Sequence, residues 1–386
     1  MSEAPPSVGK DFAHPRVFGI RVRPVTARRF ANFRANRRAR VALWLFLGVF
    51  LITLFADFIA NDRPILVKYD GQFYVPVLAT YPETTFGGEF ETEAEYRDVY
   101  VRDLINAKGW QVWPLIPFSY RTINYELTQP APSPPSAVNW LGTDDQARDV
   151  LARLIYGLRI SILFGLTLTA IASVIGVAVG AVQGYFAGWT DLILQRVIEV
   201  WSGMPQLYLL IMMSSGIILP SVFGRPGFWT LLTILLLFEW ISLVSVVRAE
   251  FLRARNLDYV RAARALGQPD RVIMWKHVLP NAVVATITFL PFNLTGGISL
   301  LTGLDFLGLG LPPGSASLGE LVNQGKANLQ APWLGFTAFF SLAILLSLLV
   351  FIGEGLRDAF DPRKTTAAGA PAPAALPAAD TKAQLP

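Results

Sequence analysis

The chain contains a series of apolar runs that are each long enough to cross a membrane, and this feature limits its fold more than any other. A helix rises about 1.5 Å per residue, so about 20 apolar residues span the roughly 30 Å hydrocarbon layer of a bilayer. Hydrophobic residues make up 53% of the 386 residues and charged residues only 16%, which favours an all-α polytopic membrane protein. We expect six spans, at residues 41–60, 160–186, 192–219, 229–247, 282–304 and 333–352.

Arginine-rich flanks give the expected orientation of these spans. The first span follows a tail crowded with arginine, and it has no small-residue cleavage site, so we expect an uncleaved anchor. Arg248, Arg253 and Arg255 follow the fourth span, and Arg357 follows the sixth. Because positively charged flanks remain in the cytoplasm, both termini are expected there.

The polar stretch between the first two spans is expected to form a small domain outside the membrane. It is rich in acidic and aromatic residues. Thr92 and Glu95 have the spacing of a capping box, which predicts one helix over residues 96–107 before Gly109. The aromatic side chains are those of a small core and an interfacial belt, or alternatively of a docking or peptide-contact surface.

The expected organisation of the chain follows from these features. A second capping box, Thr143 with Gln146, predicts a helix lying on the outer membrane surface. The final stretch is rich in alanine and proline and is expected to be disordered. The segments are a basic cytoplasmic tail (1–40), the first span (41–60), a periplasmic insert (61–140), an interfacial helix (141–158), a core with five spans and a coupling loop at 249–281 (159–362), and the disordered tail (363–386).

Small and polar residues inside the spans predict how they pack. Gly176, Gly180, Gly184 and Gly188 recur at four-residue spacing, which forms a smooth ridge where another helix can approach closely. Pro205 predicts a kink in the third span.

Three charged residues of the third and fourth predicted spans are candidates for a role inside the membrane. Arg196 and Glu199 are three residues apart and can pair, which lowers the cost of their burial. Glu239 lies near the middle of the fourth span and must face the interior of the bundle or a wet cavity. It either has a structural partner, such as Arg196 or another subunit, or lines the cavity and senses a cationic substrate amine.

The composition argues against catalysis by this chain. It has no cysteine, and His14 and His277 are far apart, so a metal site is not expected and no catalytic residues are predicted. No phosphate-binding Gly-x-x-x-x-Gly-Lys-Ser/Thr loop occurs, and no soluble segment could hold a nucleotide-binding sheet. The positive charges flank the spans, which favours lipid contact over nucleic acid.

A charged segment between the fourth and fifth spans is expected to face the cytoplasm. Asn256 is a candidate N-cap for a short helix to Leu266, and Gly267 suits a left-handed residue after its end. A second helix is expected to run to about His277, before Leu279-Pro280 turns the chain into the next span. On the first helix, one narrow face of small and apolar side chains suits a groove of a partner, or alternatively a membrane interface; it comprises Tyr259, Ala262, Ala263 and Leu266.

The spacing of this segment resembles a signature of binding-protein-dependent ABC importers. Their cytoplasmic loop has Glu-Ala-Ala, three residues, Gly, nine residues, and then an aliphatic residue, any residue and Leu-Pro. Here the corresponding residues are Arg261-Ala262-Ala263, Gly267 and Leu279-Pro280, with Arg261 in place of the acid and His277 at the aliphatic position. The block Leu141-Gly142-Thr143-Asp144 and the segment Phe306 to Gly310 also resemble the type I permeases of the dipeptide, oligopeptide and nickel group, and the long insert is most similar to the Yej branch, associated with peptides and microcin C.

The resemblance implies a six-span type I importer permease in the bacterial inner membrane. Its expected partners are a second homologous permease, two ATP-binding domains that are possibly fused in one chain, a periplasmic binding protein and a peptide substrate. ATP and magnesium would be used by the partner subunits, and this chain would bind no cofactor. The resemblance assigns coupling to the ATPase to Tyr259, Ala262, Ala263, Leu266 and Gly267, with Arg261, His277, Leu279 and Pro280 as loop anchors.

Other functions remain as alternatives to a peptide importer. A substrate such as nickel or glutathione would be compatible with the same family. An ion-gradient-driven transporter would require paired internal repeats, and the sequence shows no obvious duplicated halves. A membrane-anchored enzyme built on the insert would need a nucleophile–base pair, and none is recognisable there.

Overall fold

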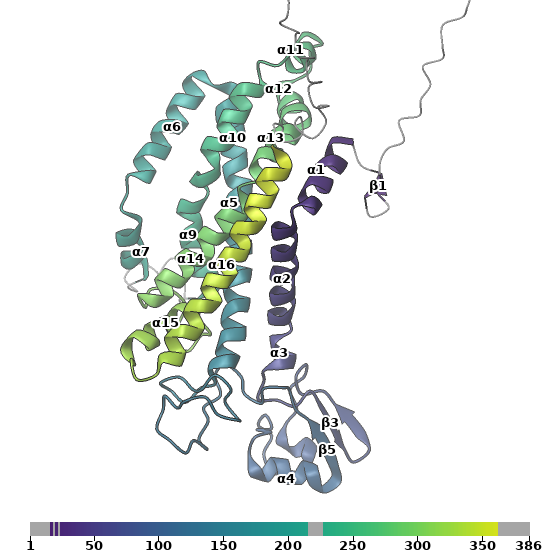
Figure 1. Cartoon of the computed structure of the whole chain (residues 1–386), viewed down its shortest axis with the longest axis vertical. Coiled ribbons are helices and arrows are strands. Elements are labelled where there is room, and N and C mark those ends of the chain that lie inside the picture. Colours follow the sequence, from purple (N-terminus) through teal and green to yellow (C-terminus); the bar gives the residue numbers. More distant parts are fainter. Residues whose placement is uncertain (1–15, 18–19, 22–23, 215–226, 362–386) are drawn as a thin grey trace, which may run out of the picture.

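The protein is a helical bundle that carries a small α/β unit at one end (Figure 1). A computed structural model describes residues 16–17, 20–21, 24–214 and 227–361. The expected disordered tail at 363–386 lies outside the described residues. At the start of the described chain, β1 (Arg16–Val17) pairs with β2 (Ile20–Arg21), and α1 (Pro24–Ala35) forms a helix that the sequence analysis did not predict.

Three long apolar helices in the described part of the chain can cross a membrane. They are α5 (Val150–Phe186), the continuous run of α9 (Phe228–Glu239) and α10 (Ile241–Ala254), and α16 (Pro332–Phe360). A fourth candidate is bent by 54° between residues 270–287 and 290–306.

The other two predicted spans correspond to shorter helices. The first becomes α2 (Arg37–Leu54) and α3 (Ala56–Ile59). The third becomes α6 (Gly188–Ser202) and α7 (Gln206–Ser214), and its last residues lie outside the described chain. Pro205 lies in the break between α6 and α7, as the predicted kink requires.

The glycine ridge on α5 brings the backbone of α10 into close contact with it. A Cβ atom on Gly176 would lie 2.5 Å from the carbonyl oxygen of Trp240, and one on Gly180 would lie 2.8 Å from that of Val244. Gly184 has the same relation to Arg248, so three ridge positions are confirmed. Gly188 does not belong to the ridge, because it lies at the start of α6 with a positive φ of 57° and with open space around its Cα.

α5 begins later than the sequence analysis predicts. The expected helix start near Leu141 is wrong, because Asp149 is the N-cap and its carboxylate accepts the Ala152 N–H at 2.7 Å. Residues 141–149 form turns instead, since the Asp144 carboxylate accepts the backbone N–H groups of Gln146 and Arg148. The predicted interfacial helix at 141–158 is therefore part loop and part first turns of α5.

A buried network of charges fixes this end of α5. Arg148 and Arg153 have almost no exposed side-chain surface, and both pair with Asp144 and with Glu320 of α15 (Leu318–Ala327). Arg153 also donates hydrogen bonds to the carbonyls of Tyr120 and Ser315. Because breaking a buried pair leaves a desolvated charge, this network holds the insert, α5 and α15 together.

The insert contains a small sheet that the sequence analysis missed. The antiparallel strands β3 (Leu66–Tyr69), β4 (Gln72–Tyr74) and β5 (Gly109–Val112) have the order β4-β3-β5. The 3₁₀ helix η1 (Glu83–Phe86) and α4 (Val99–Lys108) cover one face, with Phe86 buried among tyrosine rings. The predicted Thr92/Glu95 cap is wrong, because Asp98 caps α4 and accepts the Tyr100 N–H at 2.9 Å.

The glycine-rich segment after the fifth span is partly helical. α14 (Leu290–Phe306) continues two residues beyond the predicted end of the fifth span. The buried Asp305 then holds the following loop, because its carboxylate accepts the Leu311 N–H at 2.7 Å and the Ser317 hydroxyl at 2.5 Å.

Candidate coupling site

The short helix α11 (Asp258–Ala265) lies at the end of the bundle away from the insert (Figure 1). Gly267 follows it with φ of 74°, and the Gln268 N–H bonds to the Ala263 carbonyl at 3.2 Å, so the left-handed helix end is confirmed. The predicted Asn256 cap is wrong. Leu257 occupies the N-cap position without a side-chain cap, and the Asn256 amide donates to the Leu252 carbonyl at 3.4 Å.

The predicted contact face of α11 divides into an inner and an outer part. Ala263 is only 6% exposed and packs inward with the fully buried Val260. Leu266 is 80% exposed, Tyr259 is 39% exposed, and Ala262 is also exposed. α11 therefore attaches to its own bundle through one side and presents Tyr259, Ala262 and Leu266 to the surroundings.

A single apolar cluster joins α11 to four other elements. Val260 and Ala263 belong to the same buried cluster as Tyr185 of α5 and Phe251 of α10. The cluster continues through Ile273, Met274 and Val278 of the π-helix η2 (Ile273–Val278) to Ala282 of α13 (Leu279–Ile287). Displacing α11 alone would expose this apolar surface, at a cost of about 25 cal/mol per Å².

Polar contacts reinforce the attachment of α11 to α5. The Tyr185 hydroxyl donates to the Asp270 carboxylate at 2.6 Å, and the guanidinium of Arg264 donates to the Tyr185 oxygen at 3.3 Å. Asp270 begins α12 (Asp270–Val272), directly after the α11 turn. Tyr185 is not predictable from the sequence, because the contact joins residues 85 positions apart and neither residue is unusual in its local pattern.

The residue that replaces the family acid faces the surroundings. The Arg261 side chain is 70% exposed, and its nearest acidic partner is Asp258 of the same helix at 3.9 Å. Exposed pairs of this kind contribute little, because water screens the two charges. Arg261 therefore does not anchor the loop to the bundle.

The other predicted anchors act differently from expectation. His277 Nε2 lies 2.8 Å from Gln268 Oε1, which connects η2 to the turn after α11. Leu279 and Pro280 do not turn the chain, because they form the first turn of α13 in one continuous helical run from Asp270 to Ile287. The wider π-turn before Pro280 accommodates a ring that lacks an N–H and would clash with a regular helical turn.

A second contact missed by the sequence analysis joins α6 to α10. The guanidinium of Arg248 forms a bidentate salt bridge with the Asp191 carboxylate, and both nitrogen–oxygen distances are 2.6 Å. The guanidinium of Arg248 holds the pKa of Asp191 below its usual value. Arg248 had been assigned only to the positive flank of its span.

The charged residues inside the spans follow the sequence analysis in part. Arg196 and Glu199 pair at 2.5 Å, as predicted, and both side chains are exposed in the single chain. Arg196 is therefore not the partner of Glu239. The Glu239 carboxylate has no hydrogen bond or ion pair among the residues that the structure describes.

Glu239 is the last residue of α9, at an irregular turn within its continuous span. Trp240 separates α9 from α10, and the indole N–H groups of Trp201 and Trp240 both donate to the Leu237 carbonyl, at 2.7 and 3.0 Å. Trp201 belongs to α6, so the irregular turn is bonded to a neighbouring helix.

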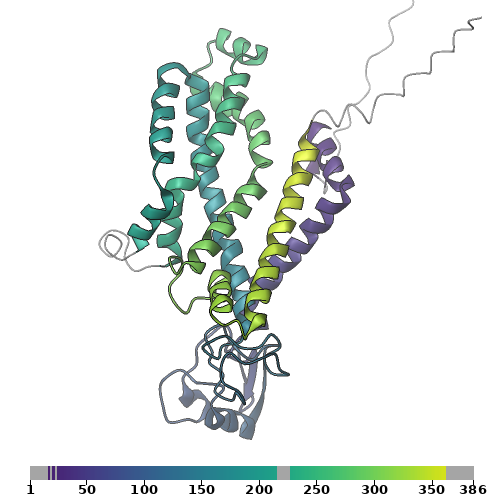
Figure 2. The same ribbon diagram turned by 60° about the vertical axis from the view of Figure 1, so that its left-hand side comes forward.

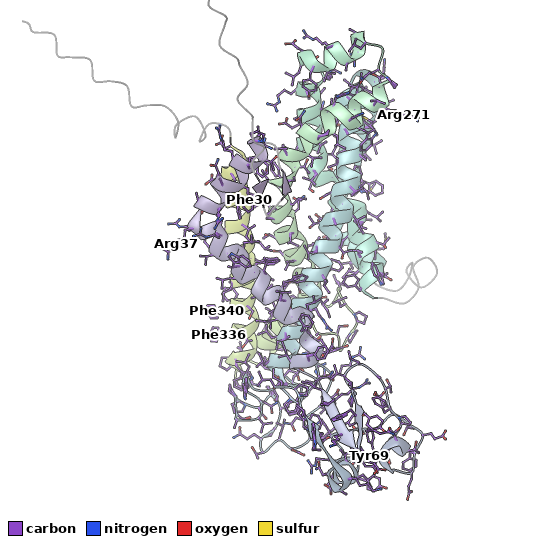
Figure 3. The ribbon with its side chains drawn as sticks, turned by 90° about the vertical axis from the view of Figure 1, so that its right-hand side faces the viewer. Phe30, Arg37, Tyr69, Arg271, Phe336 and Phe340 are labelled. Carbon is purple, nitrogen blue, oxygen red and sulfur yellow. The ribbon has the colours of Figure 1, made fainter. Side chains whose placement is uncertain are left out.

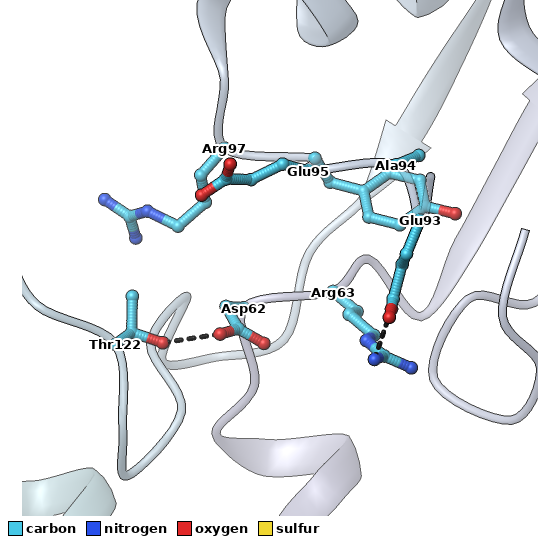
Figure 4. A pocket seen from close by; sticks show the side chains of 8 residues that line it. Asp62, Arg63, Glu93, Ala94, Glu95, Arg97 and Thr122 are labelled. Atoms are coloured by element: carbon cyan, nitrogen blue, oxygen red, sulfur yellow. Dashed lines mark hydrogen bonds and ion pairs between the residues drawn. The ribbon is translucent and has the colours of Figure 1, made fainter. Parts of the chain in front are cut away.

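A pocket of about 310 Å³ lies in the insert, at the end opposite α11 (Figure 4). Arg63 pairs with Glu93 across it, and the Thr122 hydroxyl donates to Asp62 at 2.6 Å. Among the described residues, no group of three or more potential metal-ligating His, Cys, Asp or Glu side chains occurs.

Comparison with known proteins identifies a matching family and close relatives. Residues 172–366 match the model of the "Binding-protein-dependent transport system inner membrane component" family. The Peptidoglycan transport system permease protein YejE of Agrobacterium fabrum is 56% identical over 366 residues, covering 89% of this chain and 94% of that protein. The Inner membrane ABC transporter permease protein YejE of Escherichia coli K12 is 57% identical over 344 residues, covering 89% of this chain and 99% of that protein.

More distant relatives match a smaller part of the chain. The Oligopeptide transport system permease protein OppC of Mycobacterium tuberculosis is 32% identical over 260 residues, covering 67% of this chain and 87% of that protein. Among solved structures, an inward-facing MetNI methionine ABC transporter is 18% identical, covers 54% of this chain and 96% of that chain, and has a TM-score of 0.46.

Proposed function

This chain belongs to the family of binding-protein-dependent transport system inner membrane components, and from that premise we propose that it imports peptides or peptide-like compounds by coupling a partner's ATP hydrolysis to movement of its spans. The family is the membrane-embedded part of ABC importers, so the chain is a transport subunit and not an enzyme. It is a multi-pass protein of the bacterial inner membrane. Membership implies an ATPase, a binding protein and a second permease as partners.

The coupling proposal rests on the way α11 is attached. Its outer side chains Tyr259, Ala262 and Leu266 are exposed, while its inner side is bonded and packed to α5 and α10. An apolar, protruding face of this kind fits a groove on an ATP-binding subunit. Gly267 ends the helix sharply, and His277, Leu279 and Pro280 join it to the fifth span without an intervening flexible loop.

We propose that α11 moves as a rigid body with the cytoplasmic halves of the fourth and fifth spans. The fifth span is bent by 54° at residues 288–289, and the fourth, although one continuous helix, has an irregular residue at Trp240. Such positions are where a helix can change direction while each half keeps its hydrogen bonds. ATP-driven closure of the partner would then swing the cavity from inward to outward open.

The proposed substrates are peptides or peptide-like compounds of the oligopeptide or microcin C type. Support comes from relatives whose names include oligopeptide and peptidoglycan transport, and peptidoglycan fragments contain peptide stems. Glu239 is the proposed cavity residue for a cationic amine of the substrate, because its carboxylate lies at an irregular turn inside a span. Nickel or glutathione remains the second candidate, and no metal-ligand cluster among the described residues favours it.

The proposed assembly has one copy of this chain, a homologous second permease, two ATP-binding domains in one or two chains, and a periplasmic binding protein. Both termini and α11 would lie in the cytoplasm, and the insert in the periplasm. Because the sequence has no cysteine, single cysteines at Leu266 and Leu329 test this orientation. A membrane-impermeant maleimide should label Leu329→Cys in cells with a permeabilised outer membrane and leave Leu266→Cys unlabelled, and the reverse pattern would refute it.

Co-purification tests the coupling role directly. Leu266→Asp places a charge on the outer face of α11, and Leu329→Asp is the matched control because Leu329 is 82% exposed at the other end of the protein. With co-expressed partner subunits, Leu266→Asp should lose the ATPase subunit while the control retains it. Equal retention of the ATPase by both variants would exclude this face as the contact. The substrate is tested separately with the unaltered complex. ATP hydrolysis that is stimulated by nickel and not by peptides would overturn the peptide assignment.

A further inference from the structure

A cleft of about 830 Å³ opens between two groups of helices at the end that carries α1. Figure 2 shows α2 and α16 side by side and diverging from the other spans toward this end. One wall of the cleft is formed by α1 and the end of α16, and the other by the end of α10 and by α13. The cleft is separate from the exposed face of α11 and from the irregular turn beside Glu239.

The first wall is a fixed part of the structure. The guanidinium of Arg29 lies over the ring of Phe360, 4.8 Å from its centroid. At the corner between α1 and α2, Gly355 of α16 lies so close to Ala39 that a Cβ on this glycine would be 2.1 Å from the Ala39 Cβ. These contacts attach α1 to α16, so the position of Arg29 relative to the spans is defined.

The cleft lies where the apolar parts of the spans end. The long apolar run of α16 gives way to Arg357 and Phe360 within the cleft wall, and α2 begins with Arg37 before its apolar residues. Figure 3 places Phe30 and Arg37 toward the end of the molecule away from Tyr69 in the insert. A membrane-spanning chain has lipid headgroups at this level.

Three arginines and two acidic residues line the cleft. Arg29, Arg253 and Arg357 line it, and Arg28 lines the adjoining pocket beside Phe360. The acidic lining residues are Glu250, which pairs with Arg253 at 2.6 Å, and Asp361. The neighbouring stretch of residues 24–56 contains six arginines and no acidic residue.

The lining also has an apolar part that suits acyl chains. Val25 and Phe360 lie on the first wall, and Val284 and Ala285 of α13 lie on the second. A ligand that fills the cleft therefore needs a negative group at one end and a hydrocarbon part at the other. Clusters of basic side chains beside a span attract anionic lipids by about 1 kcal/mol per residue.

We propose that this cleft is a binding site for an anionic phospholipid, with its phosphate at Arg29 and Arg357 and its acyl chains between α13 and α16. The bound lipid joins the α1–α16 wall to the α10–α13 wall. The site requires only that the chain spans the membrane, so its existence is independent of the proposed peptide substrate. A lipid is preferred over a soluble phosphate compound because of the apolar half of the lining.

Lipid retention by the complete importer tests the site. The complex is purified from membranes that contain phosphatidylglycerol, washed in detergent, and examined by native mass spectrometry. Arg29→Gln with Arg357→Gln should lower the retained phosphatidylglycerol at least fivefold. The control, Arg37→Gln with Arg38→Gln, removes two exposed arginines of the same basic segment that do not line the cleft, and should stay within twofold of the unaltered protein.

A second variant keeps every arginine and fills the apolar half of the cleft. Val284→Trp should also lower retention at least fivefold, and it guards against a general effect of removing charge. Unaltered lipid retention in both cleft variants would overturn the proposal, as would an unaltered protein that carries no phosphatidylglycerol. Cross-linking of a single cysteine at Thr26 to the second permease would also overturn it, because a protein and not a lipid would then occupy the cleft.

Discussion

The hydroxyl of Tyr185 lies 2.6 Å from a carboxylate oxygen of Asp270, so the end of one unbroken span is bonded to the turn that follows α11. α5 is 37 residues long, and its other end carries Arg153 of the buried charge network with Asp144, at the opposite end of the bundle. The fifth span, in contrast, is bent by 54°, and the fourth is a continuous helix with one irregular residue at Trp240. The α11 end is thus attached to two continuous helices and one bent helix.

Tyr185→Phe should weaken coupling without unfolding the protein. The ring remains in its apolar cluster, and only the hydrogen bonds to Asp270 and Arg264 are lost, at a cost of about 1 kcal/mol. We expect more ATP to be hydrolysed per substrate molecule imported by the assembled transporter in vesicles. Tyr74→Phe is the control, because its hydroxyl bonds only to Gln72 in the insert. An unchanged ratio of ATP to substrate would show that the bond does not transmit motion.

Gly180→Leu should disrupt the contact between α5 and α10. Even a Cβ at this position would lie 2.8 Å from the Val244 carbonyl oxygen, so the helices must separate, and overpacking of this kind costs about 1–3 kcal/mol. The melting temperature of the purified protein in detergent should fall. Gly296→Leu in α14 is the matched control, since nothing lies within 4 Å of its Cβ position. Equal melting temperatures of the two variants would contradict the close packing.

Gly267→Val should impair transport while leaving membrane insertion intact. The residue has φ of 74°, and a β-branched side chain is strained in this left-handed region, although open space surrounds it. The strain is therefore expected to change the direction that the backbone takes after α11. Gly267→Asn should retain most transport, because asparagine tolerates this conformation. Transport at the normal rate by the valine variant would mean that the sharp helix end is not needed.

Glu239→Gln distinguishes a substrate-sensing carboxylate from a structural one. If the carboxylate contacts a substrate amine, import of peptides with a free amino terminus should fall about tenfold or more, while import of acetylated peptides stays unchanged. A tenfold change corresponds to about 1.4 kcal/mol. Competition between the two peptide classes in the same vesicles provides the measurement. An equal loss for both classes would assign Glu239 to packing against another subunit.

Patterns that depend on neighbouring residues in the sequence were predictable. The ridge of Gly176, Gly180 and Gly184 and the left-handed Gly267 follow from four-residue spacing and from the conformational freedom of glycine. The identity of α11 as a separate short helix also follows from its local sequence. The coupling role of its outer residues stays a prediction.

Features that depend on distant contacts were not predictable in the same way. The sequence favours Thr143 as a helix N-cap, but the Thr143 hydroxyl accepts a hydrogen bond from the Ser133 N–H in a buried turn. Asp149 is the N-cap of α5 instead. Leu279-Pro280 has the usual pattern of a chain reversal, yet a π-turn lets the helix continue through it. The insert's strands are only three or four residues long, too short for a clear alternating pattern.

The fourth span departs from the regular helical pattern at Trp240 without a proline, and this has a consequence for the whole bundle. A proline bend is permanent, because the missing N–H belongs to the residue itself. Here the Leu237 carbonyl receives one of its two indole hydrogen bonds from Trp201 on α6, and α6 is also bonded to α10 through Asp191 and Arg248. The fourth span and α6 are therefore hydrogen-bonded to each other on both sides of Trp240, and neither can change its angle without the other.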